Sequence, residues 1–60
     1  MYFISKEDDE FVLNELNKSE GVYIPYLAYG ETLEDLQKNT DLIFDEGVID
    51  VKSLKIIEGE

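Results

Sequence analysis

The stretch Gly21-Val22-Tyr23-Ile24-Pro25-Tyr26-Leu27-Ala28-Tyr29-Gly30 contains no charged residue and holds three of the four tyrosines of the chain. Successive side chains of a strand alternate between its two faces. As a strand, the stretch therefore carries on one face Val22, Ile24, Tyr26 and Ala28, and on the other Tyr23, Pro25, Leu27 and Tyr29. Both faces are apolar or amphipathic and would be stabilised by burial. A chain of 60 residues has few residues left to pack against the second face.

Pro25 indicates which kind of strand this is. Proline cannot donate to a strand ladder, so within sheets it occurs on edge strands, at strand starts or at bulges. We therefore expect an edge or bent strand, at which a second chain can dock. Two alternatives stay open: the tyrosines only cap a small core, or Pro25 begins a helix whose apolar stripe is Tyr26, Tyr29, Leu33 and Leu36. Gly30 disfavours that helix, because glycine is a poor helix former.

The N-terminal part predicts a strand followed by a helix. Residues 2–4 (Tyr-Phe-Ile) suit a short strand that ends at Ser5. Ser5 and Asp8 have the spacing of a capping box, and acids fill the following turn, where a helix dipole favours them. We therefore predict the main helix over about residues 6–19, with Gly21 as its stop.

The C-terminal part predicts a second, shorter helix and a hairpin. Thr32 followed by an acid three residues later marks a helix start, with an end near Asn39. Residues 41–44 and 48–51 are predicted to form two strands joined by the turn 45–47, with Gly47 in the left-handed position. Residues 52–53 are predicted to form a bulge, because Leu54, Ile56 and Ile57 continue the apolar pattern with a shifted phase. Residues 58–60 are expected to be a frayed end. The predicted fold is a single α+β domain over residues 1–60, with a small antiparallel or mixed sheet of three to four short strands, one main helix and one short helix.

Composition points to self-association. A domain of 60 residues buries only about 60% of the surface that its unfolded chain exposes, so its core is small. Cysteine and histidine are both absent, which removes disulfides and the commonest metal ligands. We therefore expect a homodimer. Its predicted interface residues are Tyr23, Pro25, Tyr26, Leu27 and Tyr29.

The net charge of −10, from 15 carboxylates and five lysines, limits the partners. Nucleic acids and anionic membranes need clustered lysine and arginine, so both are disfavoured. A basic protein surface is the expected partner, attracted by electrostatic steering, although acidity can also serve only to keep a small domain in solution. Residues 1–4 are too short for a signal peptide and no apolar run approaches a membrane span, so we expect a cytoplasmic protein.

The acidic residues are the candidate partner-binding residues. On a helix, the run Glu7-Asp8-Asp9-Glu10 would place carboxylates about 5–6 Å apart, close to the spacing of phosphates along a DNA strand. A second group follows the tyrosines and extends this surface: Glu31, Glu34 and Asp35. The alternative is a solvated helix face.

Catalysis and cofactors are not expected. The acids around Gly47 lack the spacing of a calcium loop, and the serines have no histidine to activate them. In size, charge and residue bias the chain resembles the small acidic proteins with which bacteriophages inhibit host enzymes and defence systems, without sharing a specific motif. The predicted function is an inhibitor that blocks a basic, nucleic-acid-binding surface in the host cytoplasm. A regulatory or antitoxin-like subunit of a bacterial complex is the alternative.

Overall fold

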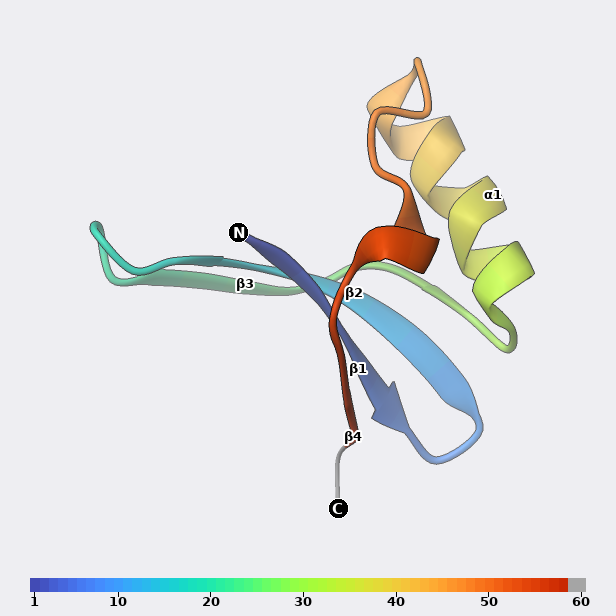
Figure 1. Cartoon of the computed structure of the whole chain (residues 1–60), viewed down its shortest axis with the longest axis horizontal. Coiled ribbons are helices and arrows are strands. Elements are labelled where there is room, and N and C mark those ends of the chain that lie inside the picture. The colour runs from blue at the N-terminus through green and yellow to red at the C-terminus, as the bar shows by residue number, and fades with distance from the viewer. Residues whose placement is uncertain (59–60) are drawn as a thin grey trace.

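The protein is an α+β fold in which one helix covers one face of a mixed four-stranded sheet (Figure 1). The computed structural model describes residues 1–58, so the frayed end expected over 58–60 lies partly outside the described residues. The elements, in chain order, are β1 (Tyr2–Glu7), β2 (Glu10–Asn17), β3 (Val22–Gly30), α1 (Leu33–Phe44), a 3-10 turn η1 (Val51–Ser53) and β4 (Ile56–Glu58). The strand order is β3-β2-β1-β4, with β4 parallel to β1 and the other pairs antiparallel.

The main helix predicted over residues 6–19 is wrong, because this segment forms the β1–β2 hairpin. Glu7 pairs with Glu10, and Asp8 and Asp9 form the turn between them. Asp8 adopts a φ of 54°, a left-handed conformation that aspartate tolerates better than most residues. The acids that resembled a helix start are therefore turn residues, and Ser5 lies inside β1 rather than at its end.

The tyrosine-rich stretch is a strand at the edge of the sheet, as predicted, and it is bent at Pro25. The β2–β3 ladder passes from the pair Leu13–Ala28 to the pair Glu15–Ile24, so β3 inserts extra residues at this point. Such a bulge accommodates proline, which has no N–H for the ladder. The alternative helix beginning at Pro25 is not formed.

The main helix is α1, which the sequence predicted as a short helix ending near Asn39. Thr32 caps it, and its side chain accepts a hydrogen bond from the Asp35 backbone N–H at 3.0 Å. The helix continues to Phe44, so the strand predicted over residues 41–44 is wrong. Residues 48–51 form no strand either, although Gly47 adopts the predicted left-handed conformation with a φ of 59°. Residues 52–53 belong to η1 rather than to a bulge.

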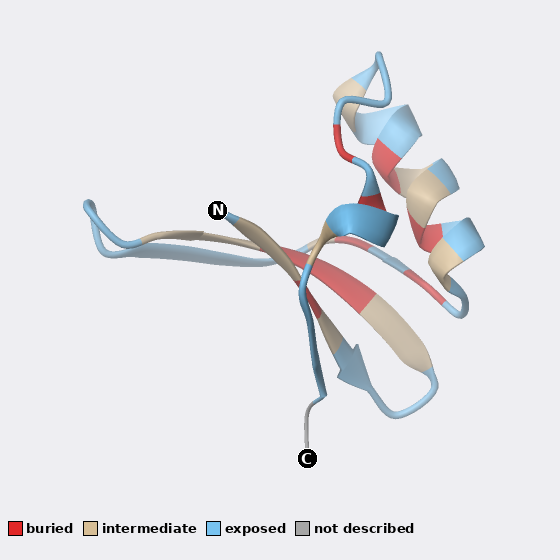
Figure 2. Ribbon diagram, viewed as in Figure 1, coloured by how far each residue is buried: buried red, intermediate tan, exposed pale blue. Residues whose placement is uncertain are grey.

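The core lies between the sheet, α1 and the segment that follows α1. Its buried apolar residues are Ile4, Leu13, Ala28, Leu36, Ile49 and Val51. They gather where β1, β2 and β3 pass beneath α1 and η1, whereas the far end of the β2–β3 hairpin is exposed or half-buried (Figure 2). A Cβ on Gly30 would lie 2.6 Å from the Leu36 backbone nitrogen, so glycine is required where β3 runs under the start of α1.

The opposite face of the sheet is not covered by a helix, and we call it the open face. Because directly paired residues point to the same side, the ladder assigns to it Phe3, Ser5, Glu7, Glu10, Val12, Asn14, Leu16, Tyr23 and Tyr29. Tyr26 joins them, since its ring meets that of Tyr29 edge to face at 6.4 Å. No helix within residues 1–58 is long and apolar enough to cross a membrane.

Candidate functional site

The fold brings together carboxylates that lie far apart in the sequence. Phe11 pairs with Gly30, so the end of β3 lies beside the start of β2. Glu31 follows Gly30 directly and therefore meets the acids of the β1–β2 turn. Figure 1 shows this turn and the start of α1 side by side. We call this region the acidic surface, and its members are Glu7, Asp8, Asp9, Glu10, Glu31 and Asp35.

Of the seven predicted partner-binding residues, six line two adjoining hollows at this end of the molecule. The first hollow has a volume of about 310 Å³ and is lined by Glu7, Asp8, Asp9, Glu10, Glu31 and Tyr26. The second, of about 430 Å³, shares Glu10 and Glu31 with the first and adds Asp35, Tyr29 and Lys38. Glu34 is exposed on α1 and lines neither hollow.

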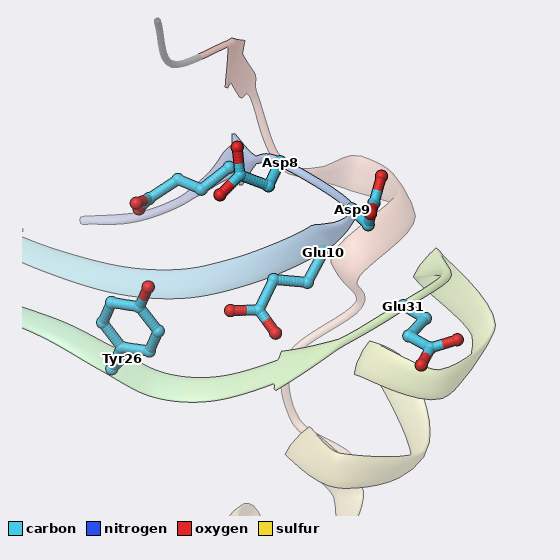
Figure 3. Close-up of a pocket in the computed structure, with 6 residues that line it drawn as sticks. Asp8, Asp9, Glu10, Tyr26 and Glu31 are labelled. Atoms are coloured by element: carbon cyan, nitrogen blue, oxygen red, sulfur yellow. The ribbon is translucent and has the colours of Figure 1, made fainter.

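Tyr26 forms one wall of the first hollow. In Figure 3 the Glu10 side chain extends toward the Tyr26 ring, while Asp9 lies at the far end of the turn. The Glu7 carboxylate, burial, and the carboxylates of Glu10 and Asp8 raise the pKa of Tyr26 above its ordinary value of 10.0. The cause is electrostatic: a phenolate would add a further negative charge to the acidic surface. The hollow therefore favours a cation beside the tyrosine ring.

Asn14 holds Tyr26 in this position, and sequence reasoning missed it. Asn14 is only 1% exposed, and its Oδ1 accepts a hydrogen bond from the Tyr26 backbone N–H at 3.3 Å. Its Nδ2 donates to the Ser5 Oγ at 3.1 Å and to the Val12 carbonyl oxygen at 3.2 Å. Asn14 thus replaces the ladder partner that the bulge removes. The available signal was an amide directly after the apolar run from Phe11 to Leu13.

The residues predicted for a dimer interface lie in different surroundings. Tyr23, Tyr26 and Tyr29 are 56%, 52% and 57% exposed, respectively, on the open face. Pro25 is exposed in the bulge, whereas Leu27 is half-buried and packs against the core. Leu27 and Tyr29 also line a hollow between β3 and α1, together with Ala28, Asn39, Leu42 and Ile43.

Within residues 1–58, no group of three or more acidic side chains has an arrangement that could hold a metal ion. No protein-family model, curated protein or solved structure matches the chain. The function is therefore argued from the chemistry of the acidic surface and its neighbouring tyrosines.

Proposed function

We propose that the protein is an inhibitor that binds, through the acidic surface, a basic nucleic-acid-binding surface of a larger protein in the cytoplasm of a bacterial host. One observation carries the proposal. Six carboxylates from two separate segments, residues 7–10 and 31–35, converge at one end of a molecule of 60 residues, and five of them line a hollow with the exposed Tyr26. Concentrating like charges destabilises the folded chain unless a partner of opposite charge neutralises them, which makes this arrangement suited to binding.

The chemistry of the target follows from complementarity. A surface that binds nucleic acid carries clustered lysine and arginine, and the acidic surface offers these side chains an alternative anionic ligand. The support comes from the density of carboxylates and not from a regular phosphate-like spacing, because Glu7–Glu10 form a turn and not a helix. Inhibition then requires only that this protein occupies the basic surface, because nucleic acid would compete with it for the same lysine and arginine side chains.

The alternative, a regulatory or antitoxin-like subunit, uses the same surface. It differs in its partner, which would be a basic protein encoded beside this one and would form a stable complex with it. The same binding experiment distinguishes the two roles by the identity of the protein captured.

The expected homodimer can form without using the acidic surface. The hollow between β3 and α1 has no carboxylate among its lining residues, and two of these, Leu42 and Ile43, are 80% and 53% exposed. Leu27 and Tyr29, two of the predicted interface residues, also line it. We place the dimer interface here, around Leu42 and Ile43, so that the acidic surface and the rings of Tyr26 and Tyr29 on the open face stay accessible to the target.

The test is capture from a bacterial lysate with the immobilised protein. A variant with Glu7→Gln, Asp8→Asn, Asp9→Asn and Glu10→Gln removes four charges from the acidic surface. A control with Glu20→Gln, Asp41→Asn, Asp45→Asn and Glu46→Gln removes four charges elsewhere. We expect the unmodified protein and the control to capture a nucleic-acid-binding protein that is released by salt and by duplex DNA.

The four-amide variant should capture that protein at least tenfold less well, with a flatter salt dependence, because steering charge is lost while shape is kept. Circular dichroism must first show that both variants are folded. Equal capture by the two variants, or a captured protein that DNA does not displace, would contradict the proposal.

A further inference from the structure

The open face presents aromatic side chains that nothing within residues 1–58 covers. The rings of Phe3 and Tyr23 stack with an interplanar angle of 14° and centroids 6.2 Å apart. Further along the face, Tyr26 and Tyr29 form the edge-to-face pair. Beneath these rings Val12 is fully buried, although it does not belong to the core under α1. The face is therefore ordered and apolar at its base, with ring surfaces turned toward solvent.

The charged side chains that β1, β2 and β3 contribute to the open face are all acidic. Among the residues that β1, β2 and β3 contribute to it, the ionised groups are the carboxylates of Glu7 and Glu10. The lysine of these strands, Lys6, lies on the other face, with its Nζ 5.5 Å from the centre of the Phe11 ring. A partner on the open face therefore meets tyrosine rings bordered by carboxylates. The hollow beside Tyr26 is lined by no lysine, whereas Lys38 of α1 lines the hollow beside Tyr29.

We propose that the open face docks a segment of the basic target through arginine side chains, which stack on Tyr26 and Tyr29 while Glu7 and Glu10 bind their guanidinium groups. This inference rests on the proposed function and names the side chain that the site selects. A guanidinium is planar, weakly hydrated and able to bind a carboxylate through two parallel hydrogen bonds while its face lies on an aromatic ring. A lysine ammonium is a strongly hydrated point charge and uses only the carboxylates well.

Charge complementarity argues for a basic segment and against a second copy as the occupant. A second copy on this face would bring its own border carboxylates, Glu7 and Glu10, into the contact. Like charges in a contact cost free energy, whereas an arginine-bearing segment neutralises them. The hollow of about 310 Å³ beside Tyr26 also has room for a guanidinium, since a water molecule occupies about 30 Å³ in the liquid.

The test uses two synthetic peptides, hexa-arginine and hexa-lysine, titrated into the isotope-labelled full-length protein at the same ionic strength. Because an exposed cation–π contact contributes a few-fold in affinity, we expect hexa-arginine to bind about three- to fivefold more tightly. The amide resonances of Tyr26 and Tyr29 should shift with hexa-arginine, while that of Val48, which lines none of the hollows beside these tyrosines, should not.

Two matched double variants isolate the ring faces. Tyr26→Phe with Tyr29→Phe keeps both rings and should keep the preference for arginine. Tyr26→Leu with Tyr29→Leu keeps apolar side chains without rings and should bring the two affinities within about twofold of each other, while binding of hexa-lysine stays unchanged. Circular dichroism must first show that both variants are folded, and the phenylalanine variant controls for the loss of the two hydroxyl groups.

The outcomes separate this inference from the proposed function. Equal affinity of the unmodified protein for the two peptides overturns the arginine preference and leaves the acidic surface as the binding site. Binding of neither peptide overturns both proposals. Dilution-dependent shifts of Tyr23 and Tyr26 in the peptide-free protein would identify a second copy as the occupant of the open face and also overturn the inference.

Discussion

At the scale of single residues, Asn14 connects the fold to the site. It lies in the middle strand of the β1–β2–β3 unit, where it satisfies the Tyr26 backbone N–H that the bulge at Pro25 leaves without a ladder partner. Tyr26 has a φ of 58°, which is unusual and costly for a bulky residue. The hydrogen bond from Asn14 therefore helps to keep the tyrosine ring beside the carboxylates of Glu7 and Glu10.

Replacing Asn14 by alanine should destabilise the protein by about 1–3 kcal/mol, because it leaves a backbone N–H without its partner and opens a cavity. Urea unfolding followed by circular dichroism measures this loss. Asn17→Ala is the control, since the hydrogen bonds of the Asn17 side chain are all solvent-exposed, and it should cost less than about 1 kcal/mol. If the two variants were equally stable, Asn14 would have no such role.

At the scale of elements, the sequence predicted the edge strand because its signals are local. The strand-forming residues from Val22 to Gly30 and the restriction imposed by Pro25 act within a few residues, and the structure confirms an edge strand bent at Pro25. The predicted division of its side chains between two faces is wrong, because the bulge puts Tyr26 on the open face with Tyr29 and leaves Leu27 packed against the core. The sequence also predicted that the two acidic groups share one surface. They meet because Phe11 pairs with Gly30, and no local pattern in the sequence reveals this pairing.

The elements predicted wrongly have ambiguous local patterns. Strand β2 is central and buried on both faces, so Val12, Leu13 and Asn14 form a continuous buried run without strand alternation. Acids at Glu7–Glu10 suit a helix start and a turn equally well. At the other end, α1 continues through Leu42 and Ile43, which are exposed. Because these apolar residues do not fall on the buried face of the helix, they break its helical periodicity and were predicted to belong to a strand.

The segment after α1 depends on one side chain of the helix. Gln37 Nε2 donates to the Ile49 carbonyl oxygen at 2.8 Å, and its Oε1 accepts from the Val51 backbone N–H at 2.9 Å. Gln37 thus serves as the ladder partner that residues 48–51 lack, which explains why this apolar segment is ordered without becoming a strand.

Replacing Gln37 by alanine should release residues 49–51 from α1. Hydrogen exchange at the Val51 amide should become at least tenfold faster, since its acceptor is removed. Gln37→Glu is the matched control: it keeps an acceptor for Val51 but loses the Nε2 donor to Ile49 and Asp41, so protection should be lost less at Val51 than in the alanine variant. Unchanged exchange at Val51 in the alanine variant would show that apolar packing alone holds the segment.

At the scale of the whole molecule, the described structure is flat and its surface is large for its mass. Its extents are 31 × 30 × 17 Å and its accessible surface is 4370 Å², against about 4000 Å² expected for a monomer of this mass. The excess reflects the single-layered end of the β2–β3 hairpin and the exposed apolar residues on α1 (Figure 2). Apolar surface left uncovered in this way favours association.

The homodimer that we place at the hollow between β3 and α1 makes a specific prediction about Leu42. Adding a strand to the β3 edge is obstructed at Tyr29, because the Asn39 amide already donates to the Tyr29 carbonyl oxygen, so we expect contact through side chains instead.

Light scattering at micromolar concentration should give twice the chain mass, since charges beyond about 10 Å are largely screened at physiological salt. Leu42→Asp should shift the protein to monomer without unfolding it, because Leu42 is 80% exposed. Val48→Asp, at a position 74% exposed but outside the hollow, should leave the dimer intact. A monomer at all concentrations in the unmodified protein, or equal effects of the two variants, would rule out this interface.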